Sequence, residues 1–159
     1  MSSAFTKDVD IGGAMPEVGE RHVSSERNLV TREGLAMMDS EIAFLQDAMG
    51  IAEAEGDREQ IALNARDLRY WSARRETAEV SVPDGQSDVV RFGMTVQLKA
   101  HDGKLVTWKI TGEDEADVKH HKISHVSPMA VALFGKKQGE TISLNGQEWK
   151  IVSLSSDAS

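Results

Sequence analysis

The sequence predicts an α+β protein in which an N-terminal antiparallel α-helical hairpin, a short coiled coil, precedes a small antiparallel β-sheet domain with one short helix. Three observations support this fold class. Apolar residues recur every three to four positions from about residue 31 to residue 80. Turn-forming residues interrupt the chain at 82–88. Short apolar alternations follow, separated by Asp-Gly and Asn-Gly pairs that favour β-turns.

Composition excludes several function classes. The 159 residues include no cysteine, which excludes disulfides, Cys-ligated zinc and thiol catalysis. The net charge is −8, and residues 30–82 hold 11 acidic against 6 basic side chains, so unaided DNA binding is disfavoured. No apolar run is long enough to span a membrane and the N-terminus has no apolar signal core, so we expect a cytoplasmic protein without a membrane partner.

The hairpin is expected over residues 30–82. It follows a predicted mobile tail over residues 1–29, where glycines and charges show no sustained periodicity. Thr31 is a suitable N-cap for the first helix. Two apolar seams on either side of Gly56 predict two paired helices. The first seam contains Leu35, Met38, Ile42, Leu45, Met49 and Ala52, and the second contains Ile61, Ala65, Leu68 and Trp71.

The break between the helices is strongly acidic. Its sequence, EAEGDREQ (53–60), holds four carboxylates and one arginine. Asp57 can cap the second helix, and Gln60 can complete a capping box with it. Capping does not explain Glu53 and Glu55, because carboxylates near the C-terminus of a helix oppose its dipole. The tip is therefore either a helix cap or a set of carboxylates that a rigid stalk delivers to a metal ion or basic site elsewhere.

Residues 83–89 predict a linker and residues 90–159 a C-terminal β domain. The Asn-Gly pair at 145–146 lies between two alternating runs and predicts a hairpin, because both central residues of a type I′ turn need positive φ. The stretch SPMAVALFG (127–135) predicts the short helix, with serine as N-cap, proline at the first helical position and glycine at the stop.

Three other features suggest chemistry less strongly. His121 and His125 flank a predicted strand and would lie about 13 Å apart, too far to share a metal, so we expect no intrinsic metal site. The loop GEDEAD (112–117) is either a solvated turn or a docking surface for a basic partner. The second helix has a basic and aromatic side that suits an interface, although its tryptophan also fits the hairpin seam. That side contains Arg66, Arg69, Tyr70, Trp71, Arg74 and Arg75.

The order of these parts resembles the bacterial GreA/GreB transcript-cleavage factor family. The stretch GEDEADVKHHKISHVSPMAVALFGKKQGE (112–140) is similar to the loop, strand and SPxAxAL-xGK helix of that family. VTREGLAMMDSEIAFL (30–45) is similar to the start of its first helix, and AEGD (54–57) to its tip. Together these stretches span nearly all of the chain from residue 30 to 154. The resemblance implies an FKBP-like fold for the C-terminal domain.

The resemblance also implies a function. Such a protein is not itself an enzyme: it inserts its hairpin into the secondary channel of RNA polymerase, docks at the channel rim, and meets nucleic acid only through the elongation complex. The tip carboxylates Asp57 and Glu59 would assist the polymerase active site by sharing its Mg²⁺, with no cofactor of their own. Glu53, Glu55 and Gln60 would support them.

The resemblance further implies a docking surface on the C-terminal domain, and we expect a monomer. Leu133 and Phe134 are consecutive and cannot share a helix face, so one of them should be more exposed. The expected docking residues are Asp114, Glu115 and Asp117 in the loop, and Ser127, Pro128, Met129, Leu133 and Phe134 on and around the short helix.

Two departures from the family pattern leave alternatives open. The second acidic tip position falls on Gln60, and each arm is about eight residues shorter, which removes roughly 12 Å of reach. Both features are closer to short-stalk relatives of the Rnk type, which bind polymerase without inducing cleavage and would compete with Gre factors. The other alternative is an FKBP-like prolyl isomerase, although Tyr70 and Trp71 lie on the hairpin, away from any aromatic pocket in the sheet domain.

Overall fold

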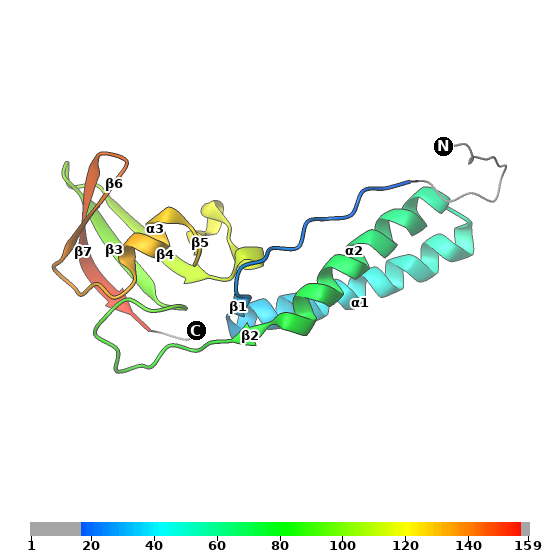
Figure 1. Cartoon of the computed structure of the whole chain (residues 1–159), viewed down its shortest axis with the longest axis horizontal. Helices are drawn as coiled ribbons and strands as arrows, with labels where there is room; N and C mark the ends of the chain where they lie inside the picture. Colours follow the sequence, from blue (N-terminus) through cyan, green and yellow to red (C-terminus); the bar gives the residue numbers. More distant parts are fainter. Residues whose placement is uncertain (1–16, 157–159) are drawn as a thin grey trace. The chain divides into compact units, whose positions relative to one another are not determined.

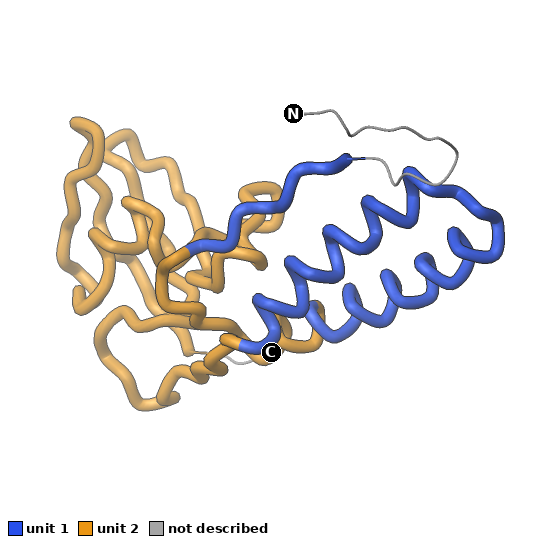
Figure 2. Tube along the Cα trace, turned by 45° about the vertical axis from the view of Figure 1, so that its right-hand side comes forward, with its two compact units in different colours: residues 1–24, 38–76 blue, residues 25–37, 77–159 orange. Residues whose placement is uncertain are grey.

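Regular structure begins with a two-residue strand, β1 (Leu29–Val30), in the computed structural model, which describes residues 17–156. Helix α1 (Arg32–Glu55) follows, and after a short break helix α2 (Arg58–Thr77) leads to strand β2 (Glu79–Val80). The two helices lie side by side and run antiparallel in both views (Figures 1 and 2). The predicted helical hairpin is confirmed.

The described chain forms two compact units. One contains residues 17–24 and 38–76, and the other contains residues 25–37 and 77–156 (Figure 2). The first residues of α1 therefore group with the sheet. The sequence placed the division differently, at the linker over residues 83–89.

The pairing of β1 with β2 explains why the start of the hairpin groups with the sheet domain. The two strands run parallel. The backbone N–H of Glu79 donates to the Asn28 carbonyl at 2.9 Å, and that of Ser81 donates to the Val30 carbonyl at 3.0 Å. The segments before α1 and after α2 are thereby joined within one unit.

The N-terminal segment is described from residue 17 onward. Residues 1–16 of the predicted tail lie outside the described residues. Residues 17–28 form neither helix nor strand, but side chains of this segment contact α2. The mobility of the tail stays a prediction.

The helical seam follows the predicted period in α1. The buried side chains Met38, Leu45 and Ala52 are spaced by seven residues, as in a coiled coil, and the other predicted seam residues are half-buried. In α2 the seam also includes the buried Ala62 and Asn64. The predicted α2 seam residues, Ile61, Ala65, Leu68 and Trp71, are half-buried.

The second unit contains a five-stranded sheet in the order β5-β4-β3-β7-β6. A hairpin joins its last two strands, and the turn residues Asn145 and Gly146 have φ of 53° and 77°, as predicted for this pair. β3 and β4, the first two strands after the linker, pair antiparallel in a continuous register. The strands are β3 (Thr95–Ala100), β4 (Leu105–Thr111), β5 (Lys122–Ser124), β6 (Thr141–Leu144) and β7 (Gln147–Ser155).

The sheet is mixed, so the prediction of a purely antiparallel sheet is wrong for one strand. β5 pairs with β4 in parallel. The connection between them is not a tight turn but contains two short 3₁₀ helices, η1 (Glu113–Glu115) and η2 (Val118–His120). A parallel neighbour requires a connection that returns the chain to the end where the first strand began, and these turns provide it.

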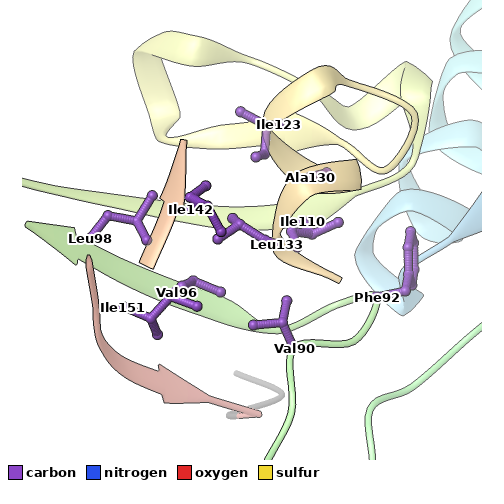
Figure 3. Close-up of a cluster of buried hydrophobic side chains, with 10 residues drawn as sticks. All are labelled: Val90, Phe92, Val96, Leu98, Ile110, Ile123, Ala130, Leu133, Ile142 and Ile151. Carbon is purple, nitrogen blue, oxygen red and sulfur yellow. The ribbon is translucent and has the colours of Figure 1, made fainter. Parts of the chain in front are cut away.

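A hydrophobic core forms between the sheet and helix α3 (Pro128–Leu133) (Figure 3). Ala130 and Leu133 face the strands from α3, and Leu133 is fully buried. Burial of one such aliphatic side chain contributes about 1.5–3 kcal/mol. The core residues are Val90, Phe92, Val96, Leu98, Ile110, Ile123, Ala130, Leu133, Ile142 and Ile151.

The carboxylate of Glu115 joins the loop after β4 to the start of α1. Its Oε2 accepts hydrogen bonds from the backbone N–H groups of Thr31 and Gly112, at 3.0 and 3.1 Å, and its Oε1 accepts one from the Thr31 hydroxyl. The Thr31 hydroxyl in turn accepts from the Gly34 N–H at 3.0 Å, which confirms Thr31 as the N-cap. A β-carbon on Gly34 would lie 2.3 Å from the Glu115 carboxyl carbon. Glycine at position 34 therefore allows the carboxylate to reach the cap.

We expect Gly34→Ala to lower the free energy of unfolding by roughly 1–3 kcal/mol, because the added methyl group overlaps Glu115. Urea denaturation followed by circular dichroism measures this change. In a Glu115→Ala background the overlap is absent, so the same substitution should cost less than about 1 kcal/mol, which is a strongly non-additive cycle.

Gly50→Ala provides a matched control in the same helix. No atom lies within 4 Å of the position that its β-carbon would take, so alanine should raise the stability by about 0.5–1 kcal/mol. Equal effects of the two substitutions would contradict the role given to Glu115. An undiminished loss of stability from Gly34→Ala in the Glu115→Ala background would also contradict that role.

Candidate functional site at the hairpin tip

Two helix caps meet at the hairpin tip. α1 ends at Gly56, whose φ of 67° is a left-handed conformation that favours glycine. The Gly56 N–H donates to the Glu53 carbonyl at 3.2 Å. The Asp57 N–H donates to the Ala52 carbonyl at 3.0 Å, which completes a Schellman motif. Asp57 then caps α2, because its Oδ1 accepts from the Gln60 N–H at 3.1 Å. The predicted N-cap is confirmed.

The predicted capping box is only half formed. The Gln60 side chain does not reach back to residue 57, and its Nε2 instead donates to Oδ1 of Asn64 at 2.9 Å. The Asp57 N–H, which a capping box would use, already donates to Ala52. The predicted role of Gln60 in a capping box is therefore wrong, because the Asp57 N–H is already used by the Schellman motif.

The four tip carboxylates are all exposed. Asp57 and Glu59 lie at the N-terminus of α2, where the helix dipole favours negative charge. Glu53 and Glu55 lie in the last turn of α1, which contains no basic residue, and there the dipole disfavours them by about 0.3–1 kcal/mol each. Capping thus accounts for part of the acidic cluster. Each of these side chains exposes oxygen atoms that can bind a basic partner or a cation held elsewhere.

The acidic loop residues have mainly local roles. Glu115 is engaged at the start of α1, as described above. Asp117 caps η2 by accepting from the Lys119 N–H at 3.0 Å, and its Oδ2 lies 2.6 Å from Nδ1 of His120. The hydrogen bond from His120 holds the pKa of the Asp117 carboxyl below its usual range. Asp114 is half-buried. The loop therefore organises its own backbone with two of the three predicted docking carboxylates.

Helix α3 begins as the sequence predicts. The Ser127 hydroxyl accepts from the Ala130 N–H at 3.3 Å, and Pro128 occupies the first helical position. The helix stops before Gly135, whose φ is 81°. These local features orient the rest of α3 against the sheet.

The exposed side of α3 differs from the predicted docking set. Leu133 belongs to the core and cannot contact a partner, whereas Phe134 and Met129 are half-buried at its edge. Val131 is 61% exposed, although the sequence reading did not select it. Helical spacing could have found it, because residues 128 and 131 share a face away from the buried pair at 130 and 133.

The basic side of α2 separates into different environments. Arg74 is buried. Arg75 pairs with Asp39 of α1 at 2.7 Å, and Arg69 pairs with Glu20 of the N-terminal segment at 2.6 Å. These residues are therefore not one continuous basic surface. The contacts with residues 17–24 had no signal in the sequence, because that segment has no periodic pattern.

The histidines do not form a cluster. His121 is exposed and His125 is buried, on either side of β5. In the described range 17–156, no group of three or more His, Asp or Glu side chains is arranged to hold a metal ion. Over the same range, no helix has both the length and the apolar character needed to cross a membrane.

Several known proteins are similar to this chain. The family model described as "Transcription elongation factor, GreA/GreB, C-term" matches residues 84–156. The crystal structure of GreA factor homolog 1 (Gfh1) of Thermus thermophilus aligns with a TM-score of 0.40 and 18% identity, over 81% of this chain and 99% of that chain. Transcription elongation factor GreA of Anaeromyxobacter sp. (strain K) is 45% identical over 76 residues, 47% of this chain. The chain matches 45% of that relative's length.

A further relative extends the similarity into the hairpin. Transcription elongation factor GreA of Methylobacterium nodulans is 34% identical over 137 residues, which is 81% of this chain and 85% of the relative. The match therefore spans most of both proteins, and it agrees with the resemblance that the sequence motifs predict. The chain belongs to the GreA/GreB family of transcription elongation factors.

Proposed function

We propose that this protein binds bacterial RNA polymerase in the cytoplasm and regulates transcription elongation by placing its hairpin tip in the secondary channel. It acts as a single copy, modulates the activity of the polymerase and catalyses no reaction by itself. It contacts nucleic acid only through the elongation complex. The relatives named above are transcription elongation factors, which supports this assignment.

One observation carries the proposal: four exposed carboxylates gather at a turn that two helix caps hold in a defined shape. Helix α1 has 24 residues and is about 36 Å long, so it carries the tip carboxylates far from the start of the hairpin. A cap needs only Asp57. The three additional glutamates, two of which oppose a helix dipole, are explained by a partner that uses them.

The carboxylates at positions 57 and 59 are the proposed working groups. Each offers exposed oxygen atoms, which suits a hard cation such as the Mg²⁺ of the polymerase active site. A second Mg²⁺ held there would stabilise the attacking and leaving oxygens during RNA hydrolysis. The protein would supply ligands to this shared ion, and it needs no cofactor of its own. Glu53 and Glu55 would add negative potential around it.

A second candidate is a regulator that occupies the channel without stimulating cleavage. Gln60 supports this candidate. This residue stands where the family pattern has a second acidic residue, and its amide is held by Asn64. Glu59 is adjacent, but one helical residue rotates a side chain by about 100°. The following experiments separate the two candidates.

Asp57→Asn is expected to slow RNA cleavage in stalled, backtracked elongation complexes by about tenfold or more, which corresponds to about 1.4 kcal/mol. Asparagine caps a helix as well as aspartate does, so the unfolding midpoint should stay unchanged. Glu59→Gln should slow cleavage as well. Asp47→Asn, a change to an exposed carboxylate in the middle of α1, serves as the control. A wild-type protein that binds the polymerase without speeding cleavage would establish the second candidate.

Gln60→Glu tests the departure at the second acidic position. The substitution adds a carboxylate but removes the donor to Asn64, so we expect faster cleavage together with a loss of about 1 kcal/mol in stability. Cleavage assays and urea denaturation of the same preparation measure both effects. Unchanged cleavage by the variant would show that the side chain at this position does not reach the active site.

Val131→Glu is expected to weaken binding to the polymerase by about tenfold or more, because it places a charge on the exposed apolar side of α3. Fluorescence anisotropy with a labelled protein measures the affinity. Leu105→Glu, at an exposed position in β4, is the control for a general effect of added charge. Equal losses in the two variants would contradict a docking role for α3.

A further inference from the structure

A second feature lies on the hairpin, apart from the tip. Residues 17–24, which we name the N-terminal strap, follow α2 without forming helix or strand (Figure 2). The strap and α2 belong to the same compact unit. Two neighbouring strap side chains of opposite charge, Glu20 and Arg21, contact α2. The strap is thus attached by side chains rather than by a backbone ladder.

Glu20 binds the guanidinium of Arg69 in a two-point contact. The Arg69 Nε donates to Glu20 Oε1 at 2.7 Å, and Nη2 donates to Oε2 at 2.6 Å. Such fork-to-fork pairs add directional specificity to charge attraction. The Arg69 hydrogen bond also holds the pKa of the Glu20 carboxyl below its usual range.

Arg21 lies on an aromatic platform next to that pair. Its guanidinium carbon is 3.9 Å from the ring centre of Tyr70 and 5.6 Å from that of Trp71, and the two rings meet edge to face at 5.2 Å. Its Nη1 donates to Asp67 Oδ1 at 3.4 Å. The strap contacts Asp67, Arg69, Tyr70 and Trp71 of α2, and we name these four side chains together the α2 recognition face. It receives a carboxylate at one end and a guanidinium at the other.

The strap contacts remain open to solvent. The Glu20 and Arg69 side chains are 60% and 55% exposed, and the Arg21 side chain is 37% exposed. Exposed ion pairs contribute little to stability because water and salt screen them. Arg, Tyr and Trp are, however, the residues that most often dominate protein interfaces. The face therefore combines interface chemistry with an occupant that is easily displaced.

We propose that the α2 recognition face is a docking site for a polypeptide segment in which an acidic residue directly precedes an arginine, and that the strap occupies this site in cis until such a partner displaces it. The strap shows which chemistry fits, since its own Glu20-Arg21 pair fills both ends of the face. The proposal goes beyond the proposed function, because none of these residues belongs to the tip or to α3.

The charges on the face favour a polypeptide over a nucleic acid. Asp67 lies at the guanidinium end, where its carboxylate would repel a phosphate backbone. Arg66, another cation of α2, is paired with Asp67 at 3.0 Å. The aromatic rings receive a guanidinium, which proteins carry and nucleic acids do not.

NMR of the full chain tests the cis contact. Glu20→Arg places a guanidinium against Arg69, so the backbone amides of residues 19–23 should become mobile on the nanosecond timescale. Glu17→Arg makes the same charge change at an exposed strap position and should leave them unchanged. Arg69→Glu combined with Glu20→Arg restores opposite charges and should restore order. Equal mobility in all four proteins would overturn the proposal.

Titration with a synthetic peptide of residues 17–24 tests the site in trans. The Arg69 Nε–H and Trp71 indole N–H resonances should respond at a peptide concentration at least about tenfold lower in Glu20→Arg than in wild type, because the tethered strap competes at millimolar effective concentration. Equal half-saturation in both proteins, or no response in Glu20→Arg, would overturn the proposal. An eight-nucleotide single-stranded RNA that shifts the same resonances more strongly than the peptide would also overturn it.

Discussion

The carboxylate of Glu115 is the contact on which the arrangement of the second compact unit depends. It accepts hydrogen bonds from two segments, including Thr31, which is 84 residues away along the chain. A partly buried carboxylate that accepts several N–H and O–H donors forms stronger bonds than an exposed ion pair does. This contact holds the N-cap of α1 next to the loop after β4, and Gly34 provides the space for it. The start of α1 is therefore held by this contact.

α1 continues from the Glu115 contact to the hairpin tip. Because α1 runs without interruption from residue 32 to 55, the same helix that begins at the Glu115 contact ends in the glutamates of the tip. The turn there joins a Schellman motif to an N-cap, and Asp57 contributes its N–H to the first and its carboxylate to the second. Stability and proposed function therefore share one residue, which is why a substitution that keeps the cap but removes the charge is informative.

Charged side chains are distributed unevenly along the hairpin. At the tip, acidic side chains remain exposed and are available to a partner. Farther along α2, arginines pair with acidic groups of α1 and of the strap. Exposed pairs of this kind contribute little to stability, because water and salt screen them. Their weakness suits the proposed exchange of the strap for a partner, whereas the core between α3 and the sheet is buried.

Local spacing in the sequence was enough to predict the helical hairpin, the caps at Thr31, Asp57 and Ser127, the Asn-Gly turn and the family, because each depends on residues within a few positions of one another. The tip residues are likewise local, although their use by a partner is a proposal. Only the tertiary structure decided that β5 runs parallel to β4, that Glu115 turns inward and that Leu133 is buried while Val131 is exposed. It also placed the strap on α2. These features depend on contacts between segments far apart in the chain, and no local rule for propensity or capping contains that information.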